Sequence, residues 1–352
     1  MSRNGIDQAG GGIDIAIPCY NYGHFLRDCV ASVLSQEIPS LRVLIIDNAS
    51  TDDSVEIAQQ LAEDDRRVEV AAHRQNLGPH ASFNEGIEWA RSDYFMVLCA
   101  DDLLVLGALS RAVSIMEKHA NVGFTHGRGY YWQPRVPQPA FDPEPLDQQW
   151  QILAGKDVLR RFCRDGVNHI PGPSTVVVRT SVQKLAGYYR PELPHTDDFE
   201  MWMRLTRLGA VAKTEAYQAI LRLHESAQKA SACPVYTCER PPALPWEDEA
   251  AFASFFAHED CSSPETARLY RLAERSLGDR AYWAAVAHLF RGQPGVTRDL
   301  FKFALTRRPS RALLPPISYL FRRQDAASRI VSVASELLRR SRTGAGPVGM
   351  KA

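Results

Sequence analysis

Short apolar runs and segments with helical spacing alternate along the first 120 residues. The apolar runs predict strands over residues 13–17, 42–46, 68–71 and 94–98. Between them, apolar residues recur every three or four positions and predict helices over residues 25–34, 50–63, 80–91 and 103–119, the second of these capped by Ser50 or Thr51. Apolar strands that alternate with helices predict a mainly parallel sheet with helices on both faces.

The pattern changes further along the chain. A stretch over residues 130–150, rich in Pro and aromatic residues, predicts an irregular excursion, and a strand at 176–178 and a helix at 199–208 follow. Beyond about Pro241 the chain is rich in Ala, Leu and Arg. We therefore divide it into a disordered N-terminal segment (1–12), an α/β domain (13–240), a basic helical region (241–345) and a flexible tail (346–352).

Composition adds little about partners but something about location. The 41 basic side chains equal the 41 acidic ones, so whole-chain charge argues neither for nor against nucleic acid, and we expect no such partner. Seven scattered cysteines indicate reduced thiols in the cytoplasm, with Cys233 and Cys238 interpreted as two loop thiols and not a metal pair. The polar, Gly-rich N-terminus predicts no signal peptide, and no apolar run approaches transmembrane length.

Acidic side chains follow the ends of the predicted strands. Ligands of parallel sheets bind outside the carboxyl ends of the strands, where Asp101 and Asp102 follow the fourth strand. Two adjacent carboxylates at a buried strand end are costly unless a cation or hydrogen-bond donors satisfy them. Mg²⁺ or Mn²⁺ would do so and would also bind substrate phosphates. The alternative is that the pair caps the following helix.

Asp47, after the second strand, favours the ligand-binding interpretation. Its carboxylate lies at the same predicted edge and can accept hydrogen bonds from a base or a ribose, although helix capping is again the alternative. The acids together outline a slot for a base at one end and a metal-bound diphosphate at the other. No Gly-rich phosphate loop follows a strand, because Gly10, Gly11 and Gly12 precede the first one, and a metal is therefore favoured.

A series of motifs resembles the family 2 glycosyltransferases. The resemblance runs over residues 13–225 and is carried by Ile17–Asn21, Ile46–Asp52, Asn76–Gly78, Asn84–Gly86 and Ala100–Asp102. Cys99 stands where the D-x-D-D segment of this family often has its first Asp. The resemblance implies a GT-A nucleotide-diphospho-sugar transferase fold, transfer with inversion from a nucleotide-sugar donor (a UDP-sugar favoured), and Mn²⁺ or Mg²⁺ as cofactor.

The same resemblance assigns roles around the donor. It places Asp47 on the base, Asp101 toward the ribose and Asp102 on the metal. Leu221–His224 is similar to the family's Y-R-x-H segment, so His224 is a second candidate for the metal or the diphosphate, the alternative being an ordinary surface or core histidine. The residues that the resemblance places at the donor are Pro18, Tyr20, Asn21, Asp47, Asn48, Asn76, Asn84, Asp101 and Gly172.

The segment from His195 to Trp202 is similar to the family's E-D-x-D-L-W segment, whose second acid is the catalytic base. This similarity maps the base to Asp198, which would take the proton of the acceptor hydroxyl as that oxygen attacks the anomeric carbon. Acids in a first helical turn also serve the helix dipole, and that alternative stays open. Asp197, Trp202 and His169 are further candidates on the acceptor side or in the shell around the site.

The basic C-terminal region helps to predict which kind of acceptor the protein uses. An apolar stripe (Ile330, Val331, Ala334, Leu337, Leu338) flanked by arginines predicts either a helix at anionic lipid headgroups or one packed on the catalytic domain. The first case places a cytoplasmic protein on the inner face of the cell membrane. It makes a lipid-linked saccharide a reasonable acceptor, beside a glycan, in bacterial-type surface polysaccharide or glycoconjugate synthesis. Self-association into a homo-oligomer is left open.

Two other functions compete with sugar transfer. A nucleotidyltransferase also combines a parallel sheet with metal-binding acids, but it would have a Gly-rich, basic loop after the first strand, where this chain has Tyr20–His24. A non-catalytic protein that binds nucleotide-sugars or glycans would tolerate the loss of the Asp198 carboxylate. The transferase would lose turnover.

Overall fold

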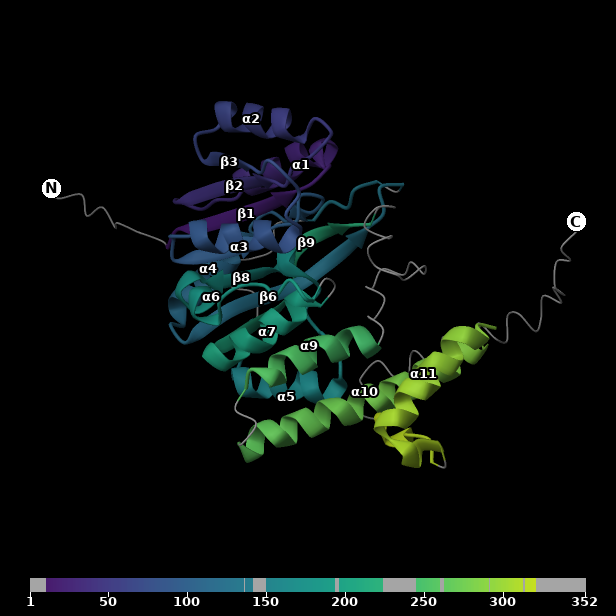
Figure 1. Cartoon of the computed structure of the whole chain (residues 1–352). Coiled ribbons are helices and arrows are strands. Elements are labelled where there is room, and N and C mark those ends of the chain that lie inside the picture. The colour runs from purple at the N-terminus through teal and green to yellow at the C-terminus, as the bar shows by residue number, and fades with distance from the viewer. Residues whose placement is uncertain are drawn as a thin grey trace, which may run out of the picture. The chain divides into compact units, whose positions relative to one another are not determined.

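The computed structural model describes residues 11–135, 137–141, 150–193, 196–223, 245–259, 263–290, 292–312 and 314–320 (Figure 1). The chain divides into two compact units. An α/β unit comprises the residues up to 159 together with 168–242, and a helical unit comprises 160–167 together with the residues from 243 onward.

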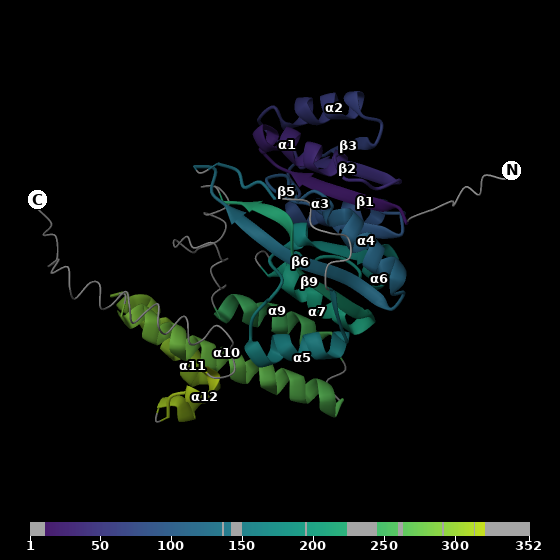
Figure 2. The ribbon, with the colours of Figure 1, turned by 180° about the vertical axis from the view of Figure 1, so that it is seen from behind.

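The α/β unit is built on a mixed, mainly parallel sheet with the strand order β3-β2-β1-β4-β8-β6-β9-β5, and β7 pairs with β9. The first four strands of this order are parallel: β3 (Val68–Ala72), β2 (Leu41–Asp47), β1 (Ile13–Cys19) and β4 (Tyr94–Val97). The strand β8 (Val176–Arg179) is antiparallel to both β4 and β6 (Val122–Trp132). The long strand β9 (Ala210–Arg222) runs parallel to β6, whereas β5 (Leu103–Leu104) and β7 (Trp150–Leu153) are antiparallel to β9. The views from both sides show β6 and β9 next to each other (Figures 1 and 2).

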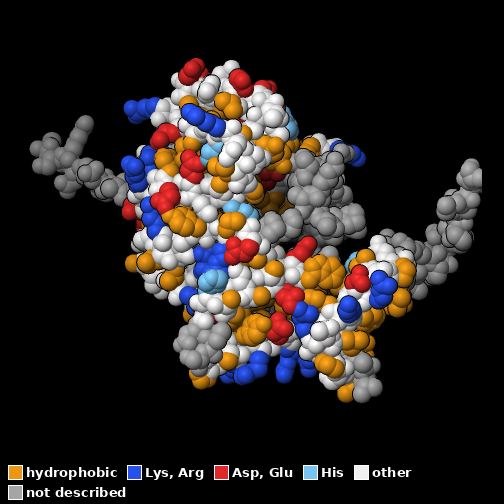
Figure 3. Space-filling model, in the orientation of Figure 1, with side chains coloured by type: hydrophobic (Ala, Val, Ile, Leu, Met, Phe, Trp, Pro, Cys, Tyr) orange, Lys and Arg blue, Asp and Glu red, His pale blue; other side chains and the backbone are white. Residues whose placement is uncertain are grey.

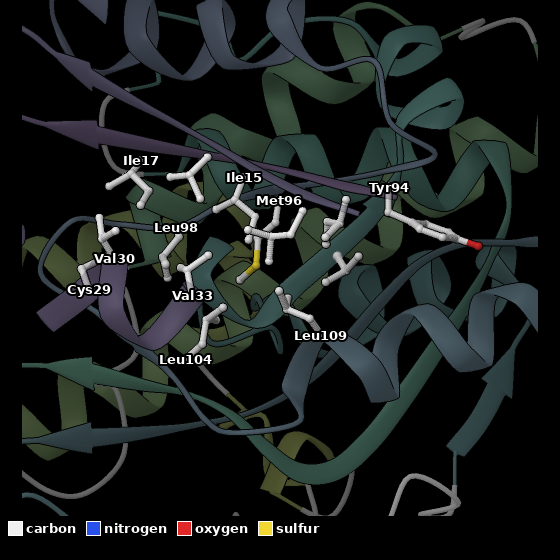
Figure 4. Close-up of a cluster of buried hydrophobic side chains, with 14 of the residues drawn as sticks. Ile15, Ile17, Cys29, Val30, Val33, Tyr94, Met96, Leu98, Leu104 and Leu109 are labelled. Atoms are coloured by element: carbon white, nitrogen blue, oxygen red, sulfur yellow. The ribbon is translucent and has the colours of Figure 1, made fainter. Parts of the chain in front are cut away.

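Helices cover both faces of this sheet. On one face, α1 and α4 bury apolar side chains such as Val30 and Leu109 against Ile15 and its neighbours in β1 (Figure 4). On the other face, Gly86 of α3 lies so close to β1 that a Cβ atom there would sit 2.4 Å from the Cβ atom of Ala16. The helices are α1 (Gly23–Leu34), α2 (Ser54–Asp64), α3 (Pro79–Trp89), α4 (Ala108–Lys118), α5 (Gly155–Asp165), α6 (Thr180–Ala186) and α7 (Asp197–Leu208).

Three predicted elements differ in the structure. The helix expected from residue 103 begins at Ala108, because residues 103 and 104 pair with β9 as strand β5. The helix expected from Ser50 begins at Ser54, because the backbone amides of Ser50 and Thr51 bond to the side chains of Asp47 and Asn21 in the loop. The prediction of an irregular excursion over residues 130–150 was wrong at both ends, since residues 130–132 complete β6 and residues 150–153 form β7.

The helical unit contains α9 (Pro245–Ala257), α10 (Pro264–Phe290), α11 (Pro294–Arg307) and α12 (Ile317–Leu320). Small and apolar side chains of α10 and α11, among them Ala281 and Leu300, form its core. A buried ion pair between Asp248 and Arg280 joins α9 to α10, with 2.5 Å between Oδ2 and Nη1. Within the described residues, no helix combines the length and the apolar character that a membrane span requires. The predicted apolar stripe from Ile330 and the thiols of Cys233 and Cys238 lie outside the described residues.

Acidic and basic side chains are interspersed on the face of the molecule that Figure 3 shows. This mixture agrees with the zero net charge of the chain.

Candidate active site

The loops after β1 and β2 interlock at the carboxyl edge of the sheet. The side-chain oxygen of Asn21 accepts a hydrogen bond from the Thr51 backbone at 2.8 Å, and Ser50 Oγ accepts one from the Asn21 backbone at 2.9 Å. Asn21 and Ala49 both have positive φ values, +57° and +62°. Such left-handed backbone costs about 1–3 kcal/mol for a residue other than Gly and persists only where its surroundings impose it. The two loops therefore form one rigid edge.

This edge holds Asp47, whose side chain is 1 % exposed. One carboxylate oxygen, Oδ2, accepts a hydrogen bond from the Ser50 backbone at 2.9 Å. The other, Oδ1, is buried and has no hydrogen-bond partner among the described residues. A buried acceptor without a donor costs about 1–3 kcal/mol. The Asp47 carboxylate is thus able to accept a hydrogen bond from a ligand N–H or O–H, beside the half-buried Pro18 and the exposed Tyr20.

Three asparagines assigned to the donor by resemblance bond within the protein. Asn48 donates from Nδ2 to Asn76 Oδ1 at 3.0 Å, and its own Oδ1 accepts from the Leu77 backbone at 2.9 Å. Asn84 makes two hydrogen bonds with the main chain of Tyr189, at 3.0 and 2.8 Å. The amides of Asn48 and Asn84 therefore hold the loops around the site in place.

Three segments of the α/β unit meet at Asp102, which is 7 % exposed. Its Oδ2 accepts a hydrogen bond from Ser174 Oγ at 2.6 Å, and its Oδ1 accepts one from the backbone N–H of Arg222 at 3.0 Å. The potential ligand atoms of Cys99, Asp101 and Asp102 lie within 4.8 Å of one another. The end of β9 and the turn that contains Ser174 thus fix the acid pair.

The chemistry of this cluster fits a hard divalent cation. Burial and then the neighbouring Asp101 carboxylate raise the pKa of Asp102 well above its usual range, and this effect outweighs the opposing contributions of Ser174 and Arg222. Within the described part of the chain each Asp102 oxygen accepts one hydrogen bond and keeps a lone pair. Burial and both carboxylates also raise the pKa of the Cys99 thiol, which stays protonated and is a poor ligand for Mg²⁺ or Mn²⁺. Asp101 and Asp102 are therefore the candidate ligands, and His224 lies outside the described residues.

Gly172 lies one residue before the short 3₁₀ turn Pro173–Thr175. The glycine is buried, yet a Cβ atom built on it would meet no described residue within 4 Å apart from its two neighbours in the chain. This open space next to the turn that carries Ser174 is room that a ligand can occupy. His169, in the same loop, is half-buried.

The acids predicted for catalysis begin α7. Asp198 is half-buried in the first turn, and the Asp197 carboxylate lies 3.2 Å from Nε2 of His80. Glu200 is fully buried and forms ion pairs with Arg190 and Arg204, at 3.1 and 2.8 Å.

Trp202 of the same helix is 1 % exposed and stacks on Phe124 in β6, with 6.2 Å between ring centroids. The first turn of α7 thus carries the accessible acids, and Trp202 belongs to the core.

Sequence reasoning assigned no role to Arg222, which is 8 % exposed. Its guanidinium lies over the rings of Phe25 and Trp132, at 4.4 and 5.2 Å. Its ion pair with Asp28 is long, at 3.8 Å, and its buried Nε atom has no hydrogen-bond partner among the described residues. Two sequence signals pointed to it: a charged residue at the apolar end of a strand, and its place in the Leu221–His224 segment that is similar to the family's Y-R-x-H segment. Ser174 and His80 were also missed as partners of the acids.

Comparisons with known proteins identify similar glycosyltransferases. Residues 14–185 match the family model described as "Glycosyl transferase family 2". A glycosyltransferase of Haemophilus influenzae, named as uncharacterized, is 34 % identical over 115 residues, which are 33 % of this chain and 46 % of the relative. The "GalNAc(5)-diNAcBac-PP-undecaprenol beta-1,3-glucosyltransferase" of Campylobacter jejuni is 30 % identical over 115 residues, which are 32 % of this chain and 36 % of that protein. The matched segment thus spans less than half of either relative.

Solved structures show the same fold. Residues 1–349 of S. aureus TarS in complex with UDP-GlcNAc align with a TM-score of 0.60 at 15 % identity, over 95 % of this chain and 92 % of TarS. The mannosyltransferase PcManGT from Pyrobaculum calidifontis in complex with GDP-Man and Mn²⁺ aligns with a TM-score of 0.54 at 16 % identity, over 94 % of this chain and 88 % of that protein. At such identities the likeness shows the fold alone, and it is the predicted GT-A fold.

Proposed function

Residues 14–185 form a glycosyl transferase family 2 domain, and on that premise we propose that the chain transfers a sugar, with inversion, from a nucleotide-diphospho-sugar to a hydroxyl of a glycan or a lipid-linked saccharide. The observation that carries this proposal is that one edge of the sheet holds both a buried oxygen of Asp47, without a hydrogen-bond partner in the described residues, and the acids Asp101 and Asp102. Asp47 supplies a hydrogen-bond acceptor for a base, and Asp101 and Asp102 supply oxygen ligands for a cation at the diphosphate.

The relatives support the choice of substrates. The TarS complex contains UDP-GlcNAc, which favours a UDP-sugar as donor. The Campylobacter relative is named for a saccharide on undecaprenol diphosphate, which favours a lipid-linked acceptor and a role in surface polysaccharide or glycoconjugate synthesis. PcManGT was solved with Mn²⁺, and a bound Mn²⁺ or Mg²⁺ would neutralise charge on the departing diphosphate.

Each acid of the site has a separate role in this reaction. Asp47 accepts a hydrogen bond from the base, Asp101 lies toward the ribose, and Asp102 holds the cation. The acceptor oxygen attacks the anomeric carbon on the face opposite the nucleotide, and the bond from that carbon to the diphosphate oxygen breaks. The acceptor's proton passes to the carboxylate of Asp198. The nucleoside diphosphate leaves as the second product.

The donor is identified first. Thermal unfolding of the full chain is followed with UDP-, GDP- and dTDP-sugars, with and without Mn²⁺. We expect one nucleotide-sugar to raise the Tm only when Mn²⁺ is present, because a ligand that binds the native state stabilises it. Stabilisation by the same donor in the absence of any divalent cation would contradict the role of Asp102.

The variant Asp198→Asn then tests the catalytic step. We expect it to abolish turnover while it binds donor and Mn²⁺ like the wild type. Asp157→Asn, which removes an acid from the first turn of α5, is the matched control and should keep full turnover. Wild-type turnover in Asp198→Asn would refute the assignment of the base. A wild-type protein that binds donor but transfers sugar to no glycan or lipid-linked acceptor would support the non-catalytic alternative.

A further inference from the structure

His80 of α3 lies against the start of the helix that carries the proposed base. Its Nε2 atom is 3.2 Å from Oδ2 of Asp197, which is an ion-pair distance, although this buried nitrogen makes no well-aligned hydrogen bond among the described residues, and the main chain of Leu193 bonds to the imidazole. The histidine is 7 % exposed, and the ring of Phe83 packs edge-on against it at 6.2 Å. One buried imidazole therefore contacts the chain both before α7 and at the first residue of α7.

Other contacts hold the segment before α7 without any dependence on a proton near neutral pH. Asn84 of α3 bonds twice to the main chain of Tyr189, and Arg190 is paired with the buried Glu200. The contact between His80 and Asp197 is different in kind. Its strength depends on whether the imidazole is charged, and Asp197 directly precedes Asp198.

We propose that His80 is a positioning residue that, in its protonated form, holds Asp197 and thereby sets the orientation of Asp198 toward the acceptor. This inference rests on the proposed function, in which Asp198 is the base. His80 itself touches neither donor nor acceptor. A displacement of about 1 Å at a reacting group can cost about a hundredfold in rate, so a contact beside the base is able to control turnover.

The charges around His80 favour the protonated ring. Asp197 raises the pKa of His80 above its ordinary value of 6.5 despite the opposing effect of burial, and Glu192 adds to the increase. Tyr189, in the same segment as Tyr188, Arg190 and Glu192, contacts Phe83 at 5.2 Å between ring centroids. Because the pKa is raised, the ion pair is complete below pH 6.5 and is lost as the pH rises through the pKa of the folded state.

The test compares kcat and KM across pH for the wild type, His80→Gln and His80→Lys. We expect wild-type kcat to fall as the pH rises through the pKa of His80. His80→Gln should no longer show this pH-dependent fall in kcat. At pH 6.5 its kcat should be about ten- to a hundredfold below that of the wild type, with an unchanged KM for the donor. His80→Lys, which keeps a positive charge to higher pH, should retain more activity than His80→Gln at pH 8. His126→Gln, at another histidine that is 7 % exposed, is the matched control and should keep the wild-type profile.

If His80→Gln lowers kcat by the same factor at every pH and still shows the fall in kcat at high pH, the proposal is overturned. A merely structural role predicts that result. A second measurement does not depend on activity. NMR titration of the His80 ring should give a pKa above 6.5 in the wild type and a lower value in Asp197→Asn, and identical values would refute the coupling. Wild-type turnover in Asp198→Asn would instead refute the assignment of Asp198 as the base and would leave the titration result standing.

Discussion

The hydroxyl of Ser174 lies 2.6 Å from Oδ2 of Asp102 and accepts a hydrogen bond from the Cys99 backbone at 3.2 Å. Ser174 itself is completely buried. A single side chain from the turn before β8 thus joins both ends of the segment that carries the acid pair. Because a hydrogen bond to a carboxylate is stronger than one between neutral groups, this contact orients Asp102 before any ligand arrives.

Removal of that hydroxyl should weaken metal binding. Ser174→Ala leaves one buried oxygen of Asp102 without its donor, and hydrogen bonds to charged groups contribute about 1.5–3 kcal/mol. We expect the Mn²⁺ concentration for half-maximal activity to rise about tenfold or more, as measured by metal titration of the transfer reaction. Thr125→Val removes a buried hydroxyl of β6 that bonds to the Val177 carbonyl and should leave the metal dependence unchanged. An unaltered Mn²⁺ requirement in Ser174→Ala would contradict this role.

Arg222 should recognise the diphosphate. Among the described residues its buried Nε has no hydrogen-bond partner and its ion pair with Asp28 is long, at 3.8 Å, so an anion beside Asp102 would provide a closer acceptor. We expect Arg222→Met to weaken UDP binding at least about tenfold and to leave uridine binding unchanged, by calorimetric titration of both ligands. Arg67→Met, which breaks a pair with Asp65 elsewhere in the α/β unit, is the control. An equal loss for UDP and uridine would indicate a collapsed site and not a lost phosphate contact.

The sequence predicted those features that depend only on where a residue stands relative to a single strand. Asp47 ends β2 and Asp102 follows β4 shortly after its last residue, so their place at the sheet edge was predicted. The resemblance to family 2 glycosyltransferases implied the GT-A fold, and the fold was confirmed. The strands β6 and β9 were missed, because β6 contains Gly127 and Gly129 and their pairing joins distant segments. The contacts of Asp102 span 72 residues to Ser174 and 120 residues to Arg222. Only the folded chain brings those side chains together, and the local hydrophobic periodicity of the sequence does not predict such pairs.

Asn84 offers a case in which resemblance and geometry make different predictions. The motif series places it at the donor, whereas its amide makes two hydrogen bonds with Tyr189. Asn84→Ala should therefore lower the free energy of unfolding by about 1–3 kcal/mol, because two main-chain groups lose their partner. Urea denaturation measures this change. The donor Kd, determined where the variant is fully folded, should stay within about threefold of the wild type, and a large loss of donor affinity with unchanged stability would restore the donor assignment.

The pair of Asp248 and Arg280 should control the stability of the helical unit. Both side chains are buried, and Arg280 also donates to the carbonyl of Gly166, so removal of the acid takes a carboxylate partner away from a buried guanidinium. Asp248→Ala should lower the free energy of unfolding by about 3–5 kcal/mol, as measured by denaturant unfolding of the full chain. The double variant Asp248→Leu/Arg280→Met removes both charges and should recover most of that loss, since well-packed apolar residues often replace a buried ion pair without cost. If the double variant is as unstable as the single one, packing around these side chains and not the unpaired charge determines the stability.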